Sequence, residues 1–158
     1  MEKVKIIIGD RDLSQSISNV RMIQELGNHH FFEIRVLLTE IPEKFKGILN
    51  QTAKDLIGEA VEISVGENSF RGIVTGISLN RVRRIDNELV IRGGSPTLLM
   101  DEGPNAVSFY EQTMKQIADT VFEQYKSKFS AITNSPNSKE KLKYVVQYNE
   151  SNFQFLCT

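Results

Sequence analysis

Apolar and polar residues alternate along most of the first hundred positions, with the period of two that is typical of half-buried strands. The first predicted strand runs from Val4 to Ile8 and is closed by Gly9 and Asp10, and the polar residues 10–19 are predicted to form a loop. The pattern returns in five further stretches, namely Asn19 to Leu26, Phe32 to Leu38, Val61 to Val65, Phe70 to Leu79 and Glu88 to Arg92. These stretches predict a unit built from short β-strands.

Turn formers and glycines indicate how the predicted strands are arranged. Gly27 and Asn28 form a tight-turn pair between the stretch that ends at Leu26 and the stretch that begins at Phe32, which predicts a hairpin. Gly72 and Gly76 lie inside the long stretch from Phe70 to Leu79, and glycine in a strand interior usually marks a bulge or a sharp bend. The segment from Pro42 to Leu56 has apolar residues at helical spacing and predicts either one short helix or two short turns. The expected fold is mainly β with some α, a barrel or strongly curled sheet in the α+β class.

A longer helix is predicted after a dense turn at Asp101 to Asn105. Ser108 and Glu111 have the spacing of a capping box, in which each side chain satisfies a backbone N–H of the first helical turn. Apolar residues then recur every three or four positions, at Tyr110, Met114, Ile117, Val121 and Tyr125. This periodicity predicts a helix over residues 108–126 that packs on the barrel.

A strand and a helix start are predicted near the C-terminus, after a polar stretch at residues 130–140 that is typical of a loop or linker. Leu142 to Tyr148 alternates in the strand pattern. Ser151 and Gln154 have capping-box spacing, so a helix is expected to begin near Asn152. Because the sequence stops shortly afterwards and so short a helix is marginal by itself, we expect a longer polypeptide of which this is the front part.

Composition narrows the class of protein without identifying a function. The chain has 158 residues, of which 40% are hydrophobic and 25% are charged, as in ordinary soluble globular proteins. The 19 basic and 20 acidic residues give a net charge of −1, which offers no general attraction to nucleic acid or to anionic membranes. The sequence contains no signal-peptide pattern and no apolar run long enough to span a membrane. A single cysteine excludes an internal disulfide and favours a reducing, cytoplasmic compartment.

The residue types that usually carry chemistry do not form a convincing constellation. His29 and His30 are adjacent, and because neighbours on a strand point to opposite faces they cannot readily share a metal ion. Cys157 begins no nucleophilic motif and is predicted to be a small buried residue. The acidic residues that lie in predicted turns, where no pair is singled out, are Asp10, Asp12, Asp86, Asp101 and Glu102. No catalytic, cofactor or metal site is predicted, and the protein is expected not to be an enzyme.

Two motifs leave functional alternatives open. The string from Gly93 to Pro96 is similar to a phosphate loop, but it lacks the lysine and no helix is predicted directly after it, so a bulge or turn is favoured. A basic cluster consists of Arg81, Arg83, Arg84 and Arg92. With Phe31, Phe32 or Phe70 exposed beside it, this cluster could bind oligonucleotides, although the interleaved acidic residues Asp86 and Glu88 favour a solvated turn or a subunit interface.

The string YVVQYNESNFQFL, from Tyr144 to Leu156, resembles the motif VQY-x-E-[ST]-x-x-x-FL of VgrG proteins of type VI secretion systems and of the related phage late control protein D family of tail hubs. Earlier pieces resemble the family in the same order, such as HFFEIRVLLT and FRGIVTGIS. The positions that fall on the family's patterns are Phe70, Gly72, Val74, Phe109, Thr113, Ile117, Gln147, Tyr148, Glu150, Ser151, Phe155 and Leu156. One departure is Met100-Asp101-Glu102, where many members have arginine in the turn before the long helix.

The resemblance implies a structural hub protein of a contractile injection machine. Such hubs are homotrimers with two tail-tube-like β-barrels per subunit, so that six barrels match a hexameric inner tube, and a β-helical spike and sometimes effectors follow. This sequence would supply the first barrel at residues 1–100, a connecting helix at 101–130, and at 131–158 a linker with the first strand and helix of the next section. The resemblance implies self, tube and spike partners, no cofactor, no nucleic acid and no membrane insertion. The protein would be cytoplasmic before assembly and open to export when the machine fires.

Two other classes of function remain beside this one. An OB-like barrel that binds nucleic acid would depend on the arginine cluster and exposed aromatic residues. An enzyme on a barrel scaffold is the third class, and for it the sequence singles out no residues.

Overall fold

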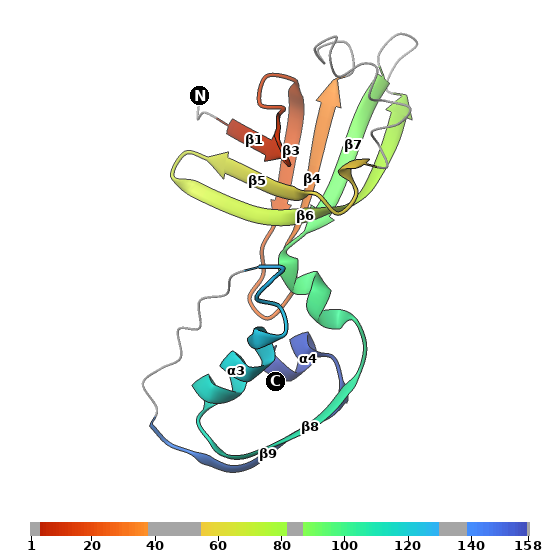
Figure 1. Ribbon diagram of the computed structural model, residues 1–158. Coiled ribbons are helices and arrows are strands. Elements are labelled where there is room, and N and C mark those ends of the chain that lie inside the picture. Colours follow the sequence, from red (N-terminus) through yellow and green to blue (C-terminus); the bar gives the residue numbers. More distant parts are fainter. Residues whose placement is uncertain (1–3, 38–54, 82–86, 130–138, 158) are drawn as a thin grey trace. The chain divides into compact units, whose positions relative to one another are not determined.

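The computed structural model describes residues 4–37, 55–81, 87–129 and 139–157, and the chain divides into two compact units, Met1–Ser95 and Pro96–Thr158 (Figure 1). The strands of the first unit are β1 (Val4–Ile8), β2 (Arg11–Asp12), β3 (Ile17–Ile23), β4 (Phe31–Leu37), β5 (Ala60–Val65), β6 (Asn68–Arg81) and β7 (Asn87–Gly94). The second unit contains the 3₁₀ helix η1 (Pro96–Asp101), β8 (Asn105–Gln112), α3 (Met114–Glu123), β9 (Leu142–Glu150) and α4 (Asn152–Cys157).

The first unit is one curled antiparallel sheet with the strand order β2-β1-β5-β6-β7-β4-β3 (Figure 1). The hairpin expected around Gly27 and Asn28 is confirmed, since β3 pairs with β4 in a register that places Ile23 opposite Phe31. The first strand has the predicted bounds, whereas the predicted loop at residues 10–19 contains β2 and the start of β3. The fold class, mainly β with few helices and a curled sheet, is as predicted.

The inner face of this sheet is closed by aliphatic and phenylalanine side chains. Fully buried members of the core include Ile6, Ile8, Ile34, Ile63 and Ile91. Each lies on the apolar side of the alternation in its strand, which is why the period-two pattern located the strands. The register shift expected near Gly76 is present, because the pairing of β6 with β7 is interrupted between Val74 and Gly76.

Two glycines allow the rings in the middle of this core to pack. Phe32 of β4 and Phe70 of β6 meet edge to face, with ring centroids 5.9 Å apart. A Cβ atom on Gly72 would lie 2.6 Å from the Gly94 carbonyl oxygen and 2.8 Å from the Phe70 ring. A Cβ atom on Gly93 would lie 2.0 Å from the Ile73 carbonyl oxygen and 2.5 Å from the Phe32 ring. The F-x-G-x-V pattern of β6 is therefore a packing motif in which glycine makes room for aromatic neighbours.

The second unit corrects the prediction of a helix over residues 108–126. Residues 105–112 form β8, which pairs with β9 in a register that places Ser108 opposite Val146. The helix α3 begins at Met114, and Thr113 with Gln116 makes its capping box instead of Ser108 with Glu111. The local pattern failed here because the partner strand of β8 lies more than thirty residues further along the chain, where only tertiary pairing can override helical spacing.

The helical face proposed for that segment is also only partly correct. Ile117, Val121 and Tyr125 are buried, but Tyr110 and Met114 are 65% and 61% exposed. The buried cluster of this unit is completed by Met100 and Phe109, and the Phe109 ring stacks on Phe155 of α4 at 5.7 Å. Phe155 and Leu156 of the last helix, two of the family-pattern positions, are partly buried against this cluster.

Several predicted elements lie wholly or partly outside the described residues. Of the helix expected between Pro42 and Leu56, the structure describes only Asp55 and Leu56, which are helical. Most of the charged turn expected from Arg81 to Asn87 and of the loop at 130–140 is likewise not described. The strand expected from Leu142 to Tyr148 is confirmed and extends to Glu150.

Candidate functional site

The C-terminal motif builds a buried network of amide side chains, which we call the polar joint. It consists of Asn105, Gln124, Tyr125, Gln147 and Asn152. The amide of Gln147 donates to the Asn152 side-chain oxygen (2.9 Å), which also accepts from the amide of Asn105 (3.2 Å). The Asn152 amide in turn donates to the Tyr125 hydroxyl (2.8 Å) and to Gln124 (3.3 Å). Gln147 and Asn152 are 1% and 2% exposed, so the joint ties β8, β9 and both helices together from inside.

The helix start next to the joint is capped as the sequence predicts. The backbone N–H of Gln154 donates to the Ser151 hydroxyl (3.1 Å), and the backbone N–H of Ser151 donates to the Gln154 side chain (3.1 Å). The Ser151 hydroxyl donates to Asp101 at the end of η1. The backbone carbonyl of Glu150, just before the cap, accepts from the Gln147 amide (3.2 Å). Ser151 and Gln154 of the motif thus fix the start of the last helix.

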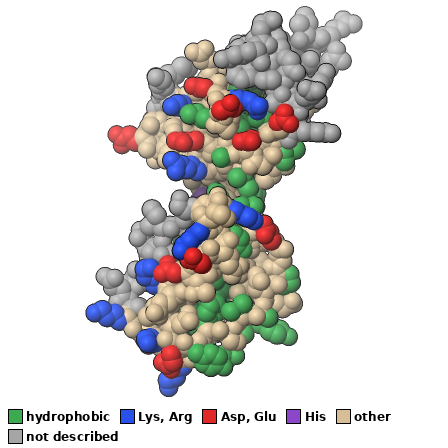
Figure 2. Space-filling view, in the orientation of Figure 1, with side chains coloured by type: hydrophobic (Ala, Val, Ile, Leu, Met, Phe, Trp, Pro, Cys, Tyr) green, Lys and Arg blue, Asp and Glu red, His purple; other side chains and the backbone are tan. Residues whose placement is uncertain are grey.

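The outer face of the β8–β9 ribbon is an uncharged surface rich in tyrosine, which we call the tyrosine face. Cross-strand pairs place Ala106 opposite Tyr148, Ser108 opposite Val146 and Tyr110 opposite Tyr144. The three tyrosines are 65% (Tyr110), 53% (Tyr144) and 79% (Tyr148) exposed. The rings of Tyr110 and Tyr144 are 4.6 Å apart, and the Tyr144 side chain raises the pKa of Tyr110. Figure 2 shows hydrophobic side chains gathered at the surface of this unit.

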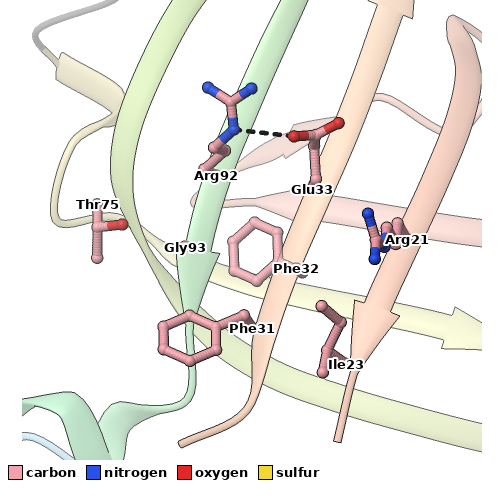
Figure 3. Close-up of a pocket in the computed structure, with 8 residues that line it drawn as sticks. All are labelled: Arg21, Ile23, Phe31, Phe32, Glu33, Thr75, Arg92 and Gly93. Atoms are coloured by element: carbon pink, nitrogen blue, oxygen red, sulfur yellow. Dashed lines mark hydrogen bonds and ion pairs between the residues drawn. The ribbon is translucent and has the colours of Figure 1, made fainter.

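A second surface feature is a groove of about 300 Å³ on the outer side of the first sheet. Its lining residues, drawn in Figure 3, are Arg21, Ile23, Phe31, Phe32, Glu33, Thr75, Arg92 and Gly93. Ile23 and Phe31 form its exposed apolar wall, at 40% and 45% exposure. The groove therefore combines an apolar wall with charged groups on neighbouring strands.

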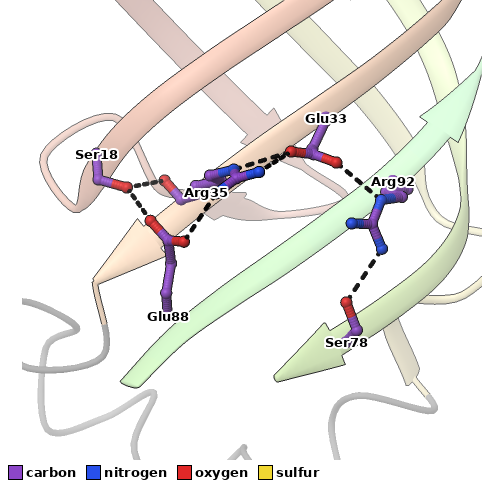
Figure 4. A network of polar contacts seen from close by, with 6 residues as sticks. All are labelled: Ser18, Glu33, Arg35, Ser78, Glu88 and Arg92. Carbon is purple, nitrogen blue, oxygen red and sulfur yellow. Dashed lines mark hydrogen bonds and ion pairs between the residues drawn. The ribbon is translucent and has the colours of Figure 1, made fainter. Parts of the chain in front are cut away.

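A chain of charged and hydroxyl groups crosses the same outer side from β3 to β6 (Figure 4). Glu33 lies at its centre, 2.7 Å from the Arg35 guanidinium and 2.8 Å from that of Arg92. Hydrogen bonds from Arg35 and then from Arg92 hold the pKa of Glu33 below its ordinary value. Arg35 also reaches Glu88 (3.4 Å), which accepts from the Ser18 hydroxyl at 2.8 Å. These charges are largely satisfied within the sheet itself.

The other sequence candidates do not converge on a reactive centre. The Nε2 atom of His30 lies 3.2 Å from the Glu25 carbonyl oxygen, and the His29 ring packs edge to face on the Phe31 ring. Two hydrogen bonds from Ser14 hold the pKa of Asp12 below its ordinary value, as in a local turn. Glu102 pairs with Lys128 at 2.9 Å. Within the described ranges, no group of three or more His, Cys, Asp or Glu side chains is placed to hold a metal ion.

Two further expectations need correction. Cys157 was predicted to be buried, but it is exposed at the end of α4. The pKa of its thiol is raised, mainly because the sulfur is partly shielded from water and secondarily because of the negative charge of Asp101. A short helix does follow the Gly93 to Pro96 string, since η1 begins at Pro96. The string still serves the sheet, because the Ser95 N–H donates to the His30 carbonyl (2.8 Å) and its hydroxyl accepts from the His30 N–H.

The described residues do not assemble the basic and aromatic surface of the nucleic-acid alternative. Phe32 and Phe70 are buried, and Arg92 is engaged with Glu33 and Ser78. Arg83, Arg84 and Asp86, as well as the side chain of Arg81, lie outside the described residues. An OB-like function is therefore not favoured. Across the same described ranges, no helix is both long enough and apolar enough to cross a bilayer.

Sequence reasoning missed the central role of Asn152 and the grouping of Arg21, Ile23 and Phe31. The sequence identifies Asn152 only as the start of a helix, and it does not reveal that this amide is buried next to the Ser151 cap. The groove residues share one side of the β3–β4 hairpin by simple alternation. A two-residue turn at Gly27-Asn28 would have placed Ile23 opposite Phe32, one residue away from the observed register, so the turn alone could not assign this face.

The chain is similar in fold to several solved tail and secretion proteins. A tail protein from Neisseria meningitidis MC58 superposes with a TM-score of 0.70 at 14% identity, over 98% of this chain and 43% of that one. The 43 kDa tail protein of prophage MuSo2 from Shewanella oneidensis gives 0.67 at 16% identity, over 99% and 46%. An E. coli type VI secretion component, described as structurally similar to bacteriophage T4 tail proteins, gives 0.61 at 14%, over 96% and 41%. The chain thus spans less than half the length of each.

At these identities the superpositions establish the fold, which agrees with the tail-tube-like curled sheet predicted from the resemblance. No curated protein matches the chain in sequence. The family model of the phage tail baseplate hub (GPD), however, matches residues 28–157, which is most of the sequence and extends from β4 of the first unit to the end of α4 in the second. The chain therefore belongs to the phage tail baseplate hub family.

Proposed function

We propose that this chain is a structural part of the hub of a contractile injection machine, either a phage tail or a type VI secretion system. The observation that carries the proposal is the baseplate-hub match over residues 28–157, which includes strands β4 to β7 of the curled sheet and the polar joint. In this role the protein works by shape and contact and performs no chemical step. The residues on the family's patterns are structural positions: Phe70, Gly72 and Val74 pack the first core, and Gln147 and Ser151 hold the second unit.

The partners that we propose are further copies of the same protein, the hexameric inner-tube protein and a spike. The first unit would be one tail-tube-like barrel, and the full protein would contain a second. Three subunits would then present six barrels, which would match the six-fold tube. The second unit would open the next section of the hub. Closed rings of identical subunits allow many small contacts to add up, which suits a protein without a single dominant interface.

The tyrosine face is the surface that we assign to the contact with a neighbouring copy. A tyrosine side chain has about 200 Å² of surface, so the exposed fractions of the three tyrosines correspond to roughly 400 Å². Tyrosine is enriched and charged residues are depleted at the centres of protein interfaces. Because a stable pair of proteins usually buries about 800 Å² on each partner, this face would be one of several contacts in a ring.

The test is the solution mass of the product of the native gene, measured by light scattering after size exclusion. A homotrimer is the expected result. Replacing Tyr148 by serine should weaken the trimer, whereas replacing Leu26, a fully exposed apolar residue on the first unit, by serine should leave it unchanged. A monomer at all concentrations would refute the trimeric hub. Equal effects of the two variants would refute only the assignment of the tyrosine face.

A further inference from the structure

The strand β3 (Ile17–Ile23) forms an open edge of the first sheet. It is the last strand in the sheet order, and β4 is its one partner among the described strands. In an antiparallel edge strand, every second residue directs its backbone N–H and C=O away from the sheet. Natural edges are usually protected by proline or by several charges, but from Asn19 to Ile23 this strand has no proline and a single charge, Arg21. The edge can therefore accept another strand.

The groove described above lies beside this edge. Its apolar wall is formed by Ile23 on β3 and Phe31 on β4, which are opposite each other in the register (Figure 3). Thr75 contributes from the point where the β6–β7 pairing is interrupted. A large apolar side chain carried by an added strand could rest against Ile23 and Phe31. An edge combined with a side-chain groove is the arrangement by which proteins bind extended peptides.

The charge at the edge is unbalanced at one position. Arg21 is directly opposite Glu33, yet both oxygens of that carboxylate are already bonded, by Arg35 at 2.7 Å and by Arg92 at 2.8 Å. The exposed Arg21 guanidinium forms no ion pair with any carboxylate of the described residues. The carboxylate of an incoming strand could therefore pair with Arg21, because Glu33 is already bonded to Arg35 and Arg92.

From these observations we propose that the β3 edge and its groove bind an extended strand of a partner protein that carries a carboxylate and a large apolar residue two positions apart. Arg21 and Ile23 are themselves two residues apart on one face of β3. A paired strand places its own residues directly opposite them, so the carboxylate would face Arg21 and the apolar side chain would face Ile23. The backbone hydrogen bonds supply general affinity, and these two positions supply selectivity. The inference does not depend on the proposed trimer.

The experiment is an NMR titration of the ¹⁵N-labelled chain with a capped nine-residue peptide. The peptide alternates threonine with one glutamate and one phenylalanine on the opposite face, so that these two side chains are neighbours two positions apart. We expect shift changes at the amides of residues 19–23, with a Kd on the order of 1 mM for so short a ligand. A peptide with lysine in place of glutamate should bind two- to fivefold more weakly, as for an exposed ion pair of about 1 kcal/mol or less.

A charge reversal provides the matched control. Because Arg21 is exposed, Arg21→Glu should fold normally, bind the glutamate peptide more weakly and bind the lysine peptide more tightly than the original chain does. A peptide with N-methyl groups on its edge-facing amides should not bind. Equal binding of the two charged peptides, unchanged preferences in the variant, or shift changes confined to other strands would overturn the proposal. So would broadening of the β3 amides with protein concentration alone, because a second copy would then occupy the edge.

Discussion

The two units of this chain are held together by different kinds of core. The first unit packs aliphatic and phenylalanine side chains on the inner face of a seven-stranded sheet, and its buried polar residues, Ser16, Glu88 and Ser95, do not belong to this cluster. The second unit has a two-stranded ribbon, which would be marginal alone, and its centre holds the amides of Gln147 and Asn152. Apolar packing depends mainly on volume, whereas hydrogen bonds depend on direction and identity. The first unit should therefore be sensitive to steric changes and the second to the loss of single polar atoms.

The largest effect is expected from Gly93→Ala in the first unit. The new Cβ atom would lie 2.0 Å from the Ile73 carbonyl oxygen, so the β6–β7 pairing or the Phe32 ring must shift. We expect the free energy of unfolding to fall by about 3 kcal/mol, measured by urea denaturation. Gly76→Ala is the matched control, since no heavy atom lies within 4 Å of its Cβ position. A similar loss in both variants would show that the crowding is not the cause.

The next effect is expected from Asn152→Leu in the polar joint. The change removes the Asn152 bond of the Tyr125 hydroxyl and leaves the buried Gln147 amide with its longer bond to the Glu150 carbonyl. We expect a loss of about 2–3 kcal/mol, confined to the second unit. Hydrogen exchange followed by mass spectrometry would measure this, with peptides from β4 and β7 as the internal reference.

A double variant tests whether the joint acts as a network. Gln147→Leu combined with Asn152→Leu removes two mutually bonded amides together, so its cost should be smaller than the sum of the two single costs. Strict additivity would contradict the network and make the second core equivalent to the first.

A smaller effect distinguishes the observed helix start from the one predicted by spacing. Thr113→Ala removes the side chain that accepts from the Gln116 N–H at 3.2 Å, and should cost about 1 kcal/mol of helix stability. Ser108→Ala, on the exposed side of β8, should cost less than about 0.5 kcal/mol. Amide protection of α3 measured by NMR gives both values, and the reverse order would restore a helix that begins at Ser108.

The same contrast explains what the sequence could predict. In the first unit, each core strand buries one face, so alternation located the strands, and Gly27-Asn28 located the β3–β4 hairpin. In the second unit, β8 is extended because of a distant strand, and its residues happen to have helical spacing as well. The cap at Ser151 was predictable because capping is local, but the joint around Asn152 was not, since its partners come from β8, from β9 and from the two residues that follow α3.

The smallest effect is expected from the charge chain on the first sheet. The pKa of Glu33 is held below its ordinary value of 4.5 by Arg35 and Arg92, so the folded state binds the proton less readily than the unfolded state. Its contribution to stability is present above pH 4.5 and is lost as the pH falls through the lowered value. Glu33→Gln should therefore be less stable than the original chain at neutral pH, and the difference should vanish in acid.

Salt and a matched glutamate sharpen this last prediction. Because both arginines are substantially exposed, the difference at neutral pH should be small and should shrink further in about 1 M salt. Glu62→Gln, which removes a looser exposed pair with Arg71 at 3.9 Å, should change stability less. Thermal unfolding from acid to neutral pH would compare the variants. A larger effect from Glu62, or one that persists in acid, would mean that the charge chain does not stabilise the sheet and that apolar packing alone accounts for the first unit.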